Sequence, residues 1–180
     1  MVGKLEWIDA GLSALVDGGP EAVRVEPVAK ALKVTKGSFY WHFADRPAWL
    51  AAIRARWEQI ATQAVIDRVE RAGPDPQGRL ETLFTFTTRH HPGHVLEAAI
   101  RAWSLTDPKT RAVTRRIDKK RLGYVRDLLV GLGHSPAQAQ LRAQILYLAL
   151  LGEMSLVAHG GRASPPPVFQ TLLALATRRS

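Results

Sequence analysis

The sequence predicts an all-α protein with a three-helix N-terminal domain and a larger C-terminal helical domain. Apolar residues recur three and four positions apart along the long segments, as on one face of a helix. No stretch keeps the two-residue alternation of a half-buried strand. Breaks rich in glycine and proline separate these segments, which gives about nine helices. We place the domain boundary between residues 46 and 47, so the predicted domains are 1–46 and 47–180.

The first two helices have clear limits. Residues 5–16 carry one apolar face, and the helix is expected to stop at residues 18–20, Gly-Gly-Pro, because glycine accepts the left-handed C-cap and proline cannot continue a helix. Pro27 suits the first turn of the second helix, where its missing N–H costs nothing. The predicted buried side of this helix comprises Val28, Ala29 and Leu32.

The third and fourth helices begin with residues that favour N-caps. Thr35 is predicted to cap the third helix, and Asp45 the fourth, with Pro47 in its first turn. Phe39 and Phe43 lie four positions apart and are expected on the inner face of the third helix. The fourth helix is predicted to present a single apolar stripe: Leu50, Ile53, Trp57, Ile60 and Ala64.

The rest of the chain continues the helical pattern after a break at residues 73–78. Residues 145–157 are too short an apolar stretch to span a bilayer, and we interpret them as part of a buried helix. The helices expected in this part cover residues 79–89, 95–104, 107–130, 136–158 and 168–177.

Composition narrows the class of protein. The chain has no cysteine, which excludes disulfides and cysteine-ligated metals. Its net charge of +9 favours a polyanionic partner, nucleic acid or an anionic membrane surface. The N-terminus shows no signal-peptide pattern, so we expect a cytoplasmic protein. No nucleophile–base pair or phosphate-cradling glycine loop indicates an enzyme, and no cofactor is expected.

Residues 28–43 have the features that a helix-turn-helix needs. Ala29 is small enough for the helix crossing, and Val34 and Phe39 are apolar anchors. At the front of the second helix of the motif, Gly37 permits a close approach to DNA, and small or basic side chains can reach base edges. The spacing alone leaves a plain three-helix bundle with a basic edge as an alternative.

The run Val-Thr-Lys-Gly-Ser-Phe-Tyr-Trp-His-Phe at residues 34–43 closely resembles the DNA-binding domain of the TetR (tetracycline repressor) family. The resemblance implies a homodimeric regulator, usually a repressor, that binds a palindromic operator and is released by a small-molecule ligand. Lys33 departs from the glycine usual in that turn, and Arg24 from a frequent threonine. Together with the motif, the resemblance gives these candidate DNA-binding residues: Arg24, Lys33, Thr35, Lys36, Gly37, Ser38, Tyr40, Trp41, His42 and Arg46.

The C-terminal domain is expected to hold the dimer interface and an effector pocket. The apolar helices at about 136–158 and 168–177 are the candidate interface, although one face of each can simply be core. The position of the pocket in the family points to the middle helices, where ordinary core is again the alternative. The candidate ligand-lining residues are Phe84, Phe86, Trp103, Tyr147 and Glu153.

Two further patterns leave alternatives open. His90, His91 and His94 are potential metal ligands, and a helical metal-binding protein or enzyme that uses them is the alternative function. Residues 109–126 hold eight basic residues and one acidic residue. This block is either a solvated face or a long-range electrostatic contribution to DNA affinity.

Overall fold

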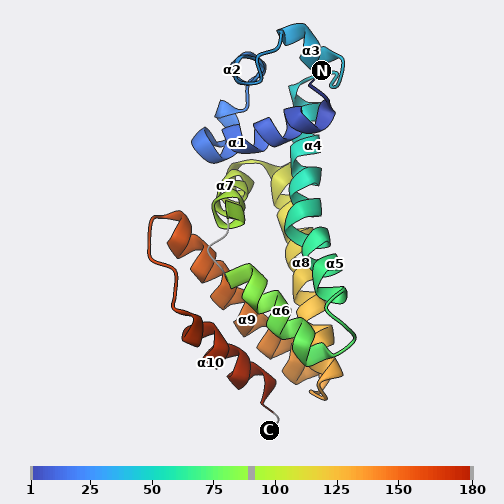
Figure 1. Ribbon diagram of the computed structural model, residues 1–180, viewed down its shortest axis with the longest axis vertical. Helices are drawn as coiled ribbons and strands as arrows, with labels where there is room; N and C mark the ends of the chain where they lie inside the picture. Colours follow the sequence, from blue (N-terminus) through green and yellow to red (C-terminus); the bar gives the residue numbers. More distant parts are fainter. Residues whose placement is uncertain (1, 89–91, 179–180) are drawn as a thin grey trace. The chain divides into compact units, whose positions relative to one another are not determined.

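The computed structural model describes residues 2–88 and 92–178. Within these ranges the regular secondary structure is entirely helical, with no strand (Figure 1). A continuous helical stretch runs through α4 (Arg46–Glu58), the π-helical turn η1 (Gln59–Gln63) and α5 (Ala64–Glu70). Counted as one helix, this stretch brings the described residues to nine helices. The predicted all-α fold class is therefore confirmed.

The chain forms two compact units, and each is considered by itself. The first unit comprises Met1–Ile60 and Ala99–Thr114, and the second comprises Ala61–Ala98 and Arg115–Ser180. The first unit therefore combines the N-terminal helices with a later segment of the chain. The division at residues 46 and 47 stays a prediction about where the DNA-binding part ends.

The N-terminal helices of the first unit are α1 (Lys4–Ala22), α2 (Val25–Ala31) and α3 (Lys36–Tyr40), followed by α4. The expected break after the first helix is confirmed: Gly18 leaves the helical conformation, and Gly19 has a φ of 68°. Only glycine adopts that left-handed φ without strain. The helical path of α1 is therefore interrupted at Gly18 and Gly19, just before Pro20.

An aromatic cluster holds these helices together. Trp7 of α1, Phe39 of α3 and Trp49 of α4 are fully buried, and their rings meet edge to face at centroid distances of 5.3–5.8 Å. The indole N–H of Trp49 donates to the Trp7 carbonyl over 3.0 Å. Phe39 and Phe43 are both buried, as predicted, but Phe43 lies after the end of α3 at Tyr40 and not on its face. Trp49 was absent from the predicted stripe of α4.

The two predicted N-caps behave differently. The Asp45 carboxylate accepts from the Ala48 N–H over 2.7 Å, which confirms the cap of α4. Thr35 occupies the N-cap position of α3 with extended backbone angles, but its side chain makes no capping hydrogen bond. Its carbonyl instead accepts from the Ser38 N–H over 3.0 Å. The predicted N-cap position of Thr35 is therefore confirmed, without a side-chain hydrogen bond.

The π-helical turn η1 changes the buried face of the long helix. A π turn contains one more residue than an α turn, so the following side chains are rotated around the axis. Thr62 is consequently buried, while Ala64 is exposed. The predicted single stripe is confirmed at Ile53 and Trp57 and is wrong at Ala64.

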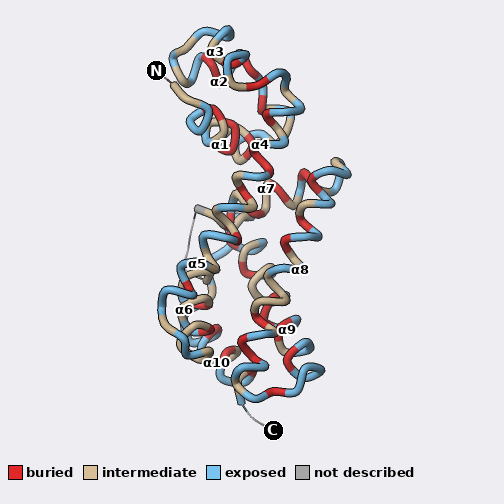
Figure 2. Tube along the Cα trace, turned by 90° about the vertical axis from the view of Figure 1, so that its right-hand side faces the viewer, coloured by how far each residue is buried: buried red, intermediate tan, exposed pale blue. Residues whose placement is uncertain are grey.

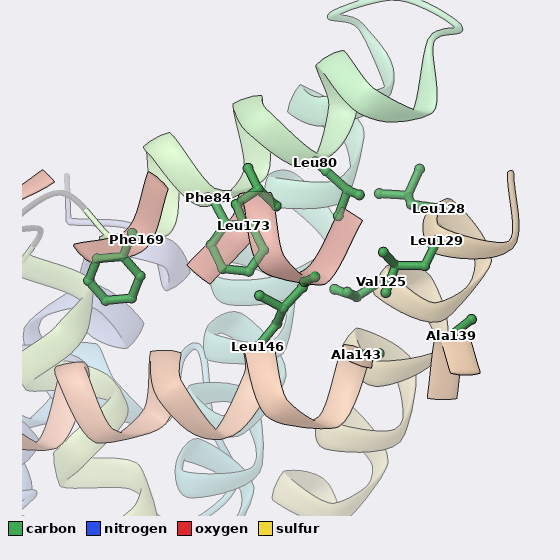
Figure 3. Close-up of a cluster of buried hydrophobic side chains, with 11 residues drawn as sticks. Leu80, Phe84, Val125, Leu128, Leu129, Ala139, Ala143, Leu146, Phe169 and Leu173 are labelled. Atoms are coloured by element: carbon green, nitrogen blue, oxygen red, sulfur yellow. The ribbon is translucent and has the colours of Figure 1, made fainter. Parts of the chain in front are cut away.

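The remaining helices are α6 (Pro76–Thr88), α7 (Pro92–Thr106), α8 (Pro108–Gly131), α9 (Pro136–Ala158) and α10 (Pro166–Thr177). The core of the second unit lies where α6, α8, α9 and α10 meet, as Figure 3 shows. Leu80, Leu129 and Leu146 are fully buried there. The Ser135 hydroxyl accepts from the Gln138 N–H over 3.3 Å and so caps α9.

Helix α9 is apolar but only partly covered. Exposed residues alternate with buried ones along α9 and α10 (Figure 2), so one face of each helix is open. By length and composition alone, α9 could cross a membrane, and 28% of its most apolar window is buried. The prediction of a buried helix is therefore wrong for its outer face, because the observed helix has 23 residues and only one side of it meets the core.

Gly11 sets the crossing of α1 and α4. A Cβ atom there would lie 2.5 Å from Cδ1 of Ile53 and 2.9 Å from Cζ2 of Trp49, both fully buried. We expect Gly11→Ala to destabilise the protein by about 1–2 kcal/mol despite its better helix propensity. Gly37→Ala meets only ordinary contacts and should be neutral or stabilising. Urea unfolding followed by tryptophan fluorescence measures both, and equal effects would contradict this account.

Candidate nucleic-acid interface and internal pocket

The front of α3 is open to solvent. Thr35, Lys36 and Gly37 are exposed, and Ser38 is partly buried. A Cβ atom at Gly37 would approach nothing closer than 3.6 Å, so the glycine is not required by packing within the chain. A short helix whose first turn lacks bulk and whose buried side is anchored by Phe39 can present that turn to a groove.

Lys36 is held by an acidic neighbour. Its Nζ lies 2.5 Å from Oε1 of Glu26 on α2, and both side chains are exposed. The hydrogen bond and charge of Glu26 raise the pKa of Lys36, and Lys36 lowers the pKa of Glu26. A phosphate or base that approaches Lys36 must therefore compete with this carboxylate.

The C-terminal end of α3 projects two large aromatic side chains. Tyr40 is 56% exposed and Trp41 is 88% exposed. Tyr40 also packs edge to face on Phe39 at 5.2 Å, which connects it to the buried cluster. His42 is partly buried, with Nε2 lying 3.2 Å from the Val2 carbonyl. Exposed rings anchored in this way can lie along a sugar–phosphate backbone.

The turn between α2 and α3 contains a left-handed residue. Lys33 has a φ of 57°, the only positive φ at a non-glycine position among residues 2–88 and 92–178. The turn is closed by the Lys33 N–H to the Lys30 carbonyl and the Val34 N–H to the Ala29 carbonyl. The departure from glycine is therefore tolerated with strain, and the exposed Lys33 side chain stays available.

The two candidate arginines differ. Arg46 donates from Nε to the Val23 carbonyl over 2.7 Å and from Nη2 to the Pro20 carbonyl over 2.5 Å. Its guanidinium therefore fixes the start of α4 to the segment after α1. Arg24 is exposed at the N-cap position of α2 and forms no side-chain cap. Of the two, Arg24 is the freer to reach a phosphate.

A pocket lies inside the second unit, with a cavity of about 70 Å³. Phe84 and Tyr147, two of the five candidate ligand residues, line it. The other three lie elsewhere. Phe86 packs under the Arg68 guanidinium at 4.7 Å, and Glu153 accepts two hydrogen bonds from Ser164, both over 2.7 Å.

Trp103 belongs to the first unit, so it does not line the pocket of the second unit as predicted. Its ring packs against the Arg54 guanidinium at 5.0 Å. Arg54 is buried and lies 3.7 Å from the Asp107 carboxylate. Burial lowers the pKa of Arg54 against the opposing pull of Asp107. The apolar environment of Trp103 is thus core with an embedded ion pair.

Arg121, on one wall of the pocket, was missed by sequence reasoning. It pairs with Glu97 of α7 at 3.0 and 3.1 Å, and both side chains are largely buried. It also donates to the Ala61 carbonyl and to the Thr62 hydroxyl. Burial alone would lower the pKa of Arg121, but Glu97 outweighs it and raises the pKa. Because Arg121 lies within the basic block of residues 109–126, the sequence pattern suggested a solvated residue there.

Comparison with known proteins identifies the N-terminal motif. Residues 8–53, from α1 into α4, match the family described as bacterial regulatory proteins, tetR family. The match covers 46 of the 180 residues, so it concerns the N-terminal motif. A curated relative is the uncharacterized HTH-type transcriptional regulator YwcC of Bacillus subtilis (strain 168), 26% identical over 129 residues, or 67% of this chain and 53% of that protein. The chain therefore spans about half the length of that relative.

Solved structures share the fold of this chain. A transcriptional regulator from Rhodococcus sp. Rha1 superposes with a TM-score of 0.77 at 20% identity, covering 98% of this chain and 94% of that chain. AibR in complex with isovaleryl coenzyme A and operator DNA superposes with a TM-score of 0.67 at 17% identity, covering 96% of each chain. At these identities, the likeness concerns the fold.

The alternative metal site finds no geometric support in the residues that the structure describes. His90 and His91 lie outside the described residues. His94 is buried, and its Nε2 lies 2.7 Å from the Thr87 carbonyl, which occupies one ring nitrogen. Across residues 2–88 and 92–178, no three His, Asp or Glu side chains gather closely enough to hold a metal ion.

The strain at Lys33 predicts an unusual effect of glycine. We expect Lys33→Gly to stabilise the protein by about 1 kcal/mol, because glycine removes the left-handed penalty. Lys30→Gly is the matched control inside α2, with the same loss of charge, and should destabilise by about 1 kcal/mol. Urea unfolding midpoints give both values. Destabilisation of similar size in the two variants would show that Lys33 carries no strain.

Proposed function

We propose that this chain is a DNA-binding transcriptional regulator that acts as a homodimer on a palindromic operator, most simply as a repressor released by a small molecule. The observation that carries the proposal is the exposed first turn of α3, which is free of bulk and anchored from below by Phe39. The match of residues 8–53 to the tetR family supports it. The site of action is the cytoplasm.

Base reading is assigned to the front of α3. Thr35, Lys36 and Ser38 offer hydroxyls and an ammonium group to base edges, and Gly37 lets the backbone approach the groove. Lys36 exchanges its Glu26 partner for DNA, so the pair opposes binding to sites that offer Lys36 no acceptor. This exchange contributes to discrimination between sequences.

Phosphate contacts are assigned to the surrounding side chains. Tyr40 and His42 at the end of α3 are expected to set the register on the duplex, with Arg24 and Lys33 contributing charge. Trp41 offers an exposed ring to the sugar backbone. Arg46 acts indirectly, by fixing α4 to the segment after α1.

The dimer interface is assigned to the outer faces of α9 and α10. The exposed apolar residues of α9 recur at helical spacing along one stripe, and those of α10 do the same. Exposed apolar stripes of this kind favour burial against a second copy through an interface that is the same on both subunits. These residues are Leu141, Ile145, Leu148, Leu156, Val168 and Leu175.

The basic block of α8 divides into two parts. Arg121 is buried in the second unit, and Arg111 donates to the carbonyls of Ser104 and Leu105. Arg115, Arg116 and Lys119 are exposed and can add to the long-range attraction of DNA. We assign them that electrostatic role only.

A selection from random duplex DNA tests the proposed function. The wild-type protein should enrich a two-fold palindrome whose half-sites lie about one helical turn apart or slightly more. Tyr40→Ala/His42→Ala should weaken operator binding by about a hundredfold, given about 1–2 kcal/mol for each lost contact. Arg162→Ala, an exposed change in the loop before α10, is the control and should leave the affinity unchanged. Salt-sensitive binding without an enriched sequence would refute specific regulation.

The dimer assignment predicts a separable effect on assembly. Leu148→Glu places a charge in the middle of the α9 stripe and should convert the dimer to a monomer, because burying two such charges costs several kcal/mol. Leu105→Glu changes an exposed leucine of α7 outside the stripe and should stay dimeric. Light scattering coupled to size exclusion measures the mass. A wild-type protein that is monomeric at all concentrations would reject the assignment.

A further inference from the structure

The pocket of the second unit has hydrocarbon walls. Its apolar lining comes from four helical segments: α5 with Val65 and Ile66, α6 with Leu83, α8 with Val125, and α9 with Leu150 and Met154. The cavity has a volume of about 70 Å³ and is partly open to solvent. A cavity of that size limits a ligand to a very small organic molecule.

The hydroxyl groups on the pocket wall already have partners. The Thr87 hydroxyl donates to the Leu83 carbonyl over 2.8 Å. The Tyr124 hydroxyl donates to the Glu70 carboxylate over 2.6 Å, and the Tyr147 hydroxyl donates to the Asp118 carboxylate, also over 2.6 Å. Burial and the Glu70 carboxylate raise the pKa of Tyr124, so this phenol stays neutral.

The charge on the pocket wall is also neutralised. All five N–H bonds of the Arg121 guanidinium have acceptors: two from the Glu97 carboxylate and one each from Ala61, Thr62 and Tyr147. The Thr62 hydroxyl is thereby engaged as well. An anion that enters the pocket would need to displace Glu97, which is itself buried and would lose its partner.

From these contacts we propose that the pocket binds a small, uncharged ligand made mainly of hydrocarbon, and that it rejects anions and cations of the same size. Polar groups that are already satisfied offer a ligand no compensation for its own desolvation, whereas apolar contact is favourable throughout. Ligand binding by this pocket does not depend on the proposed function. Its role as the effector site rests on the proposed function.

Size and adaptability fit a single ring. Met154 and Leu150 line the pocket and are only partly buried, so they can shift to admit a ligand wider than the cavity. Methionine is well suited to this because its side chain is flexible and polarizable. Toluene, benzoate and benzylammonium form a set of similar shape with charges of zero, minus one and plus one.

Calorimetric titration of the full-length protein with these three probes tests the proposal. Toluene should bind about a hundredfold more tightly than benzoate or benzylammonium, because neither charge finds a free partner in the pocket. Benzoate binding as tight as toluene, or no toluene binding, would overturn the proposal.

Two variants locate the binding. Leu150→Phe fills the pocket and should weaken toluene binding by about tenfold or more. Leu105→Phe, at an exposed position of α7, is the matched control and should bind toluene like the wild type. Equal binding by both variants would place toluene outside this pocket and overturn the proposal.

Glu97→Gln tests the reason for the charge selectivity. With its charge no longer balanced by Glu97, Arg121 should accept benzoate about tenfold more tightly, while toluene affinity stays within about twofold. Circular dichroism checks that the variant is folded. If it unfolds, the wild-type probe series decides. A folded variant without a gain for benzoate would contradict neutralisation by Glu97 as the cause.

The effector role is measured separately on the selected operator. Saturating toluene should lower operator affinity by about tenfold in the wild type and leave Leu150→Phe unaffected. Toluene binding without a change in operator affinity would overturn the effector role. Toluene binding by a protein that selects no operator would refute the proposed function and leave the pocket assignment intact.

Discussion

The organisation of the second unit depends on one buried guanidinium. Arg121 of α8 donates hydrogen bonds to the carboxylate of Glu97 on α7, to the carbonyl of Ala61 in the π-helical turn and to the hydroxyl of Tyr147 on α9. A buried charge that loses its partner typically costs roughly 3–5 kcal/mol. These segments are therefore constrained to meet at the guanidinium, which leaves the pocket beside it lined by apolar groups. The ion pair between Arg121 and Glu97 therefore both positions the pocket wall and neutralises its charge.

In the first unit, the corresponding constraint is aromatic. Trp7, Phe39 and Trp49 come from three helices and fill one small volume, with no room for a side chain at Gly11. Because α3 has only five residues, it gains little stability from its own hydrogen bonds. Its position is set by Phe39 from below and by the turn at Lys33 before it. The exposed first turn is consequently rigid without carrying bulk of its own.

Local signals in the sequence predicted much of the fold. Gly18-Gly19 and Asp45 act within a few residues, so the helix limits they predict agree with the structure. The face of the long helix after Gln59 was not predictable, because a π turn changes the periodicity on which the prediction relies. Arg121 was missed for a related reason: burial of a charge depends on a partner 24 positions away in sequence. Phe84 and Tyr147 were found on the pocket wall, whereas Trp103 lies in the other unit.

The uneven burial of the five tryptophans gives this protein an intrinsic optical label. Trp7, Trp49, Trp57 and Trp103 are at most 5% exposed, whereas Trp41 is 88% exposed at the end of α3. A water-soluble collisional quencher therefore reaches one indole and spares the other four. The quenchable part of the emission comes from the surface assigned to DNA, so its spectrum reports directly on whether that surface is covered.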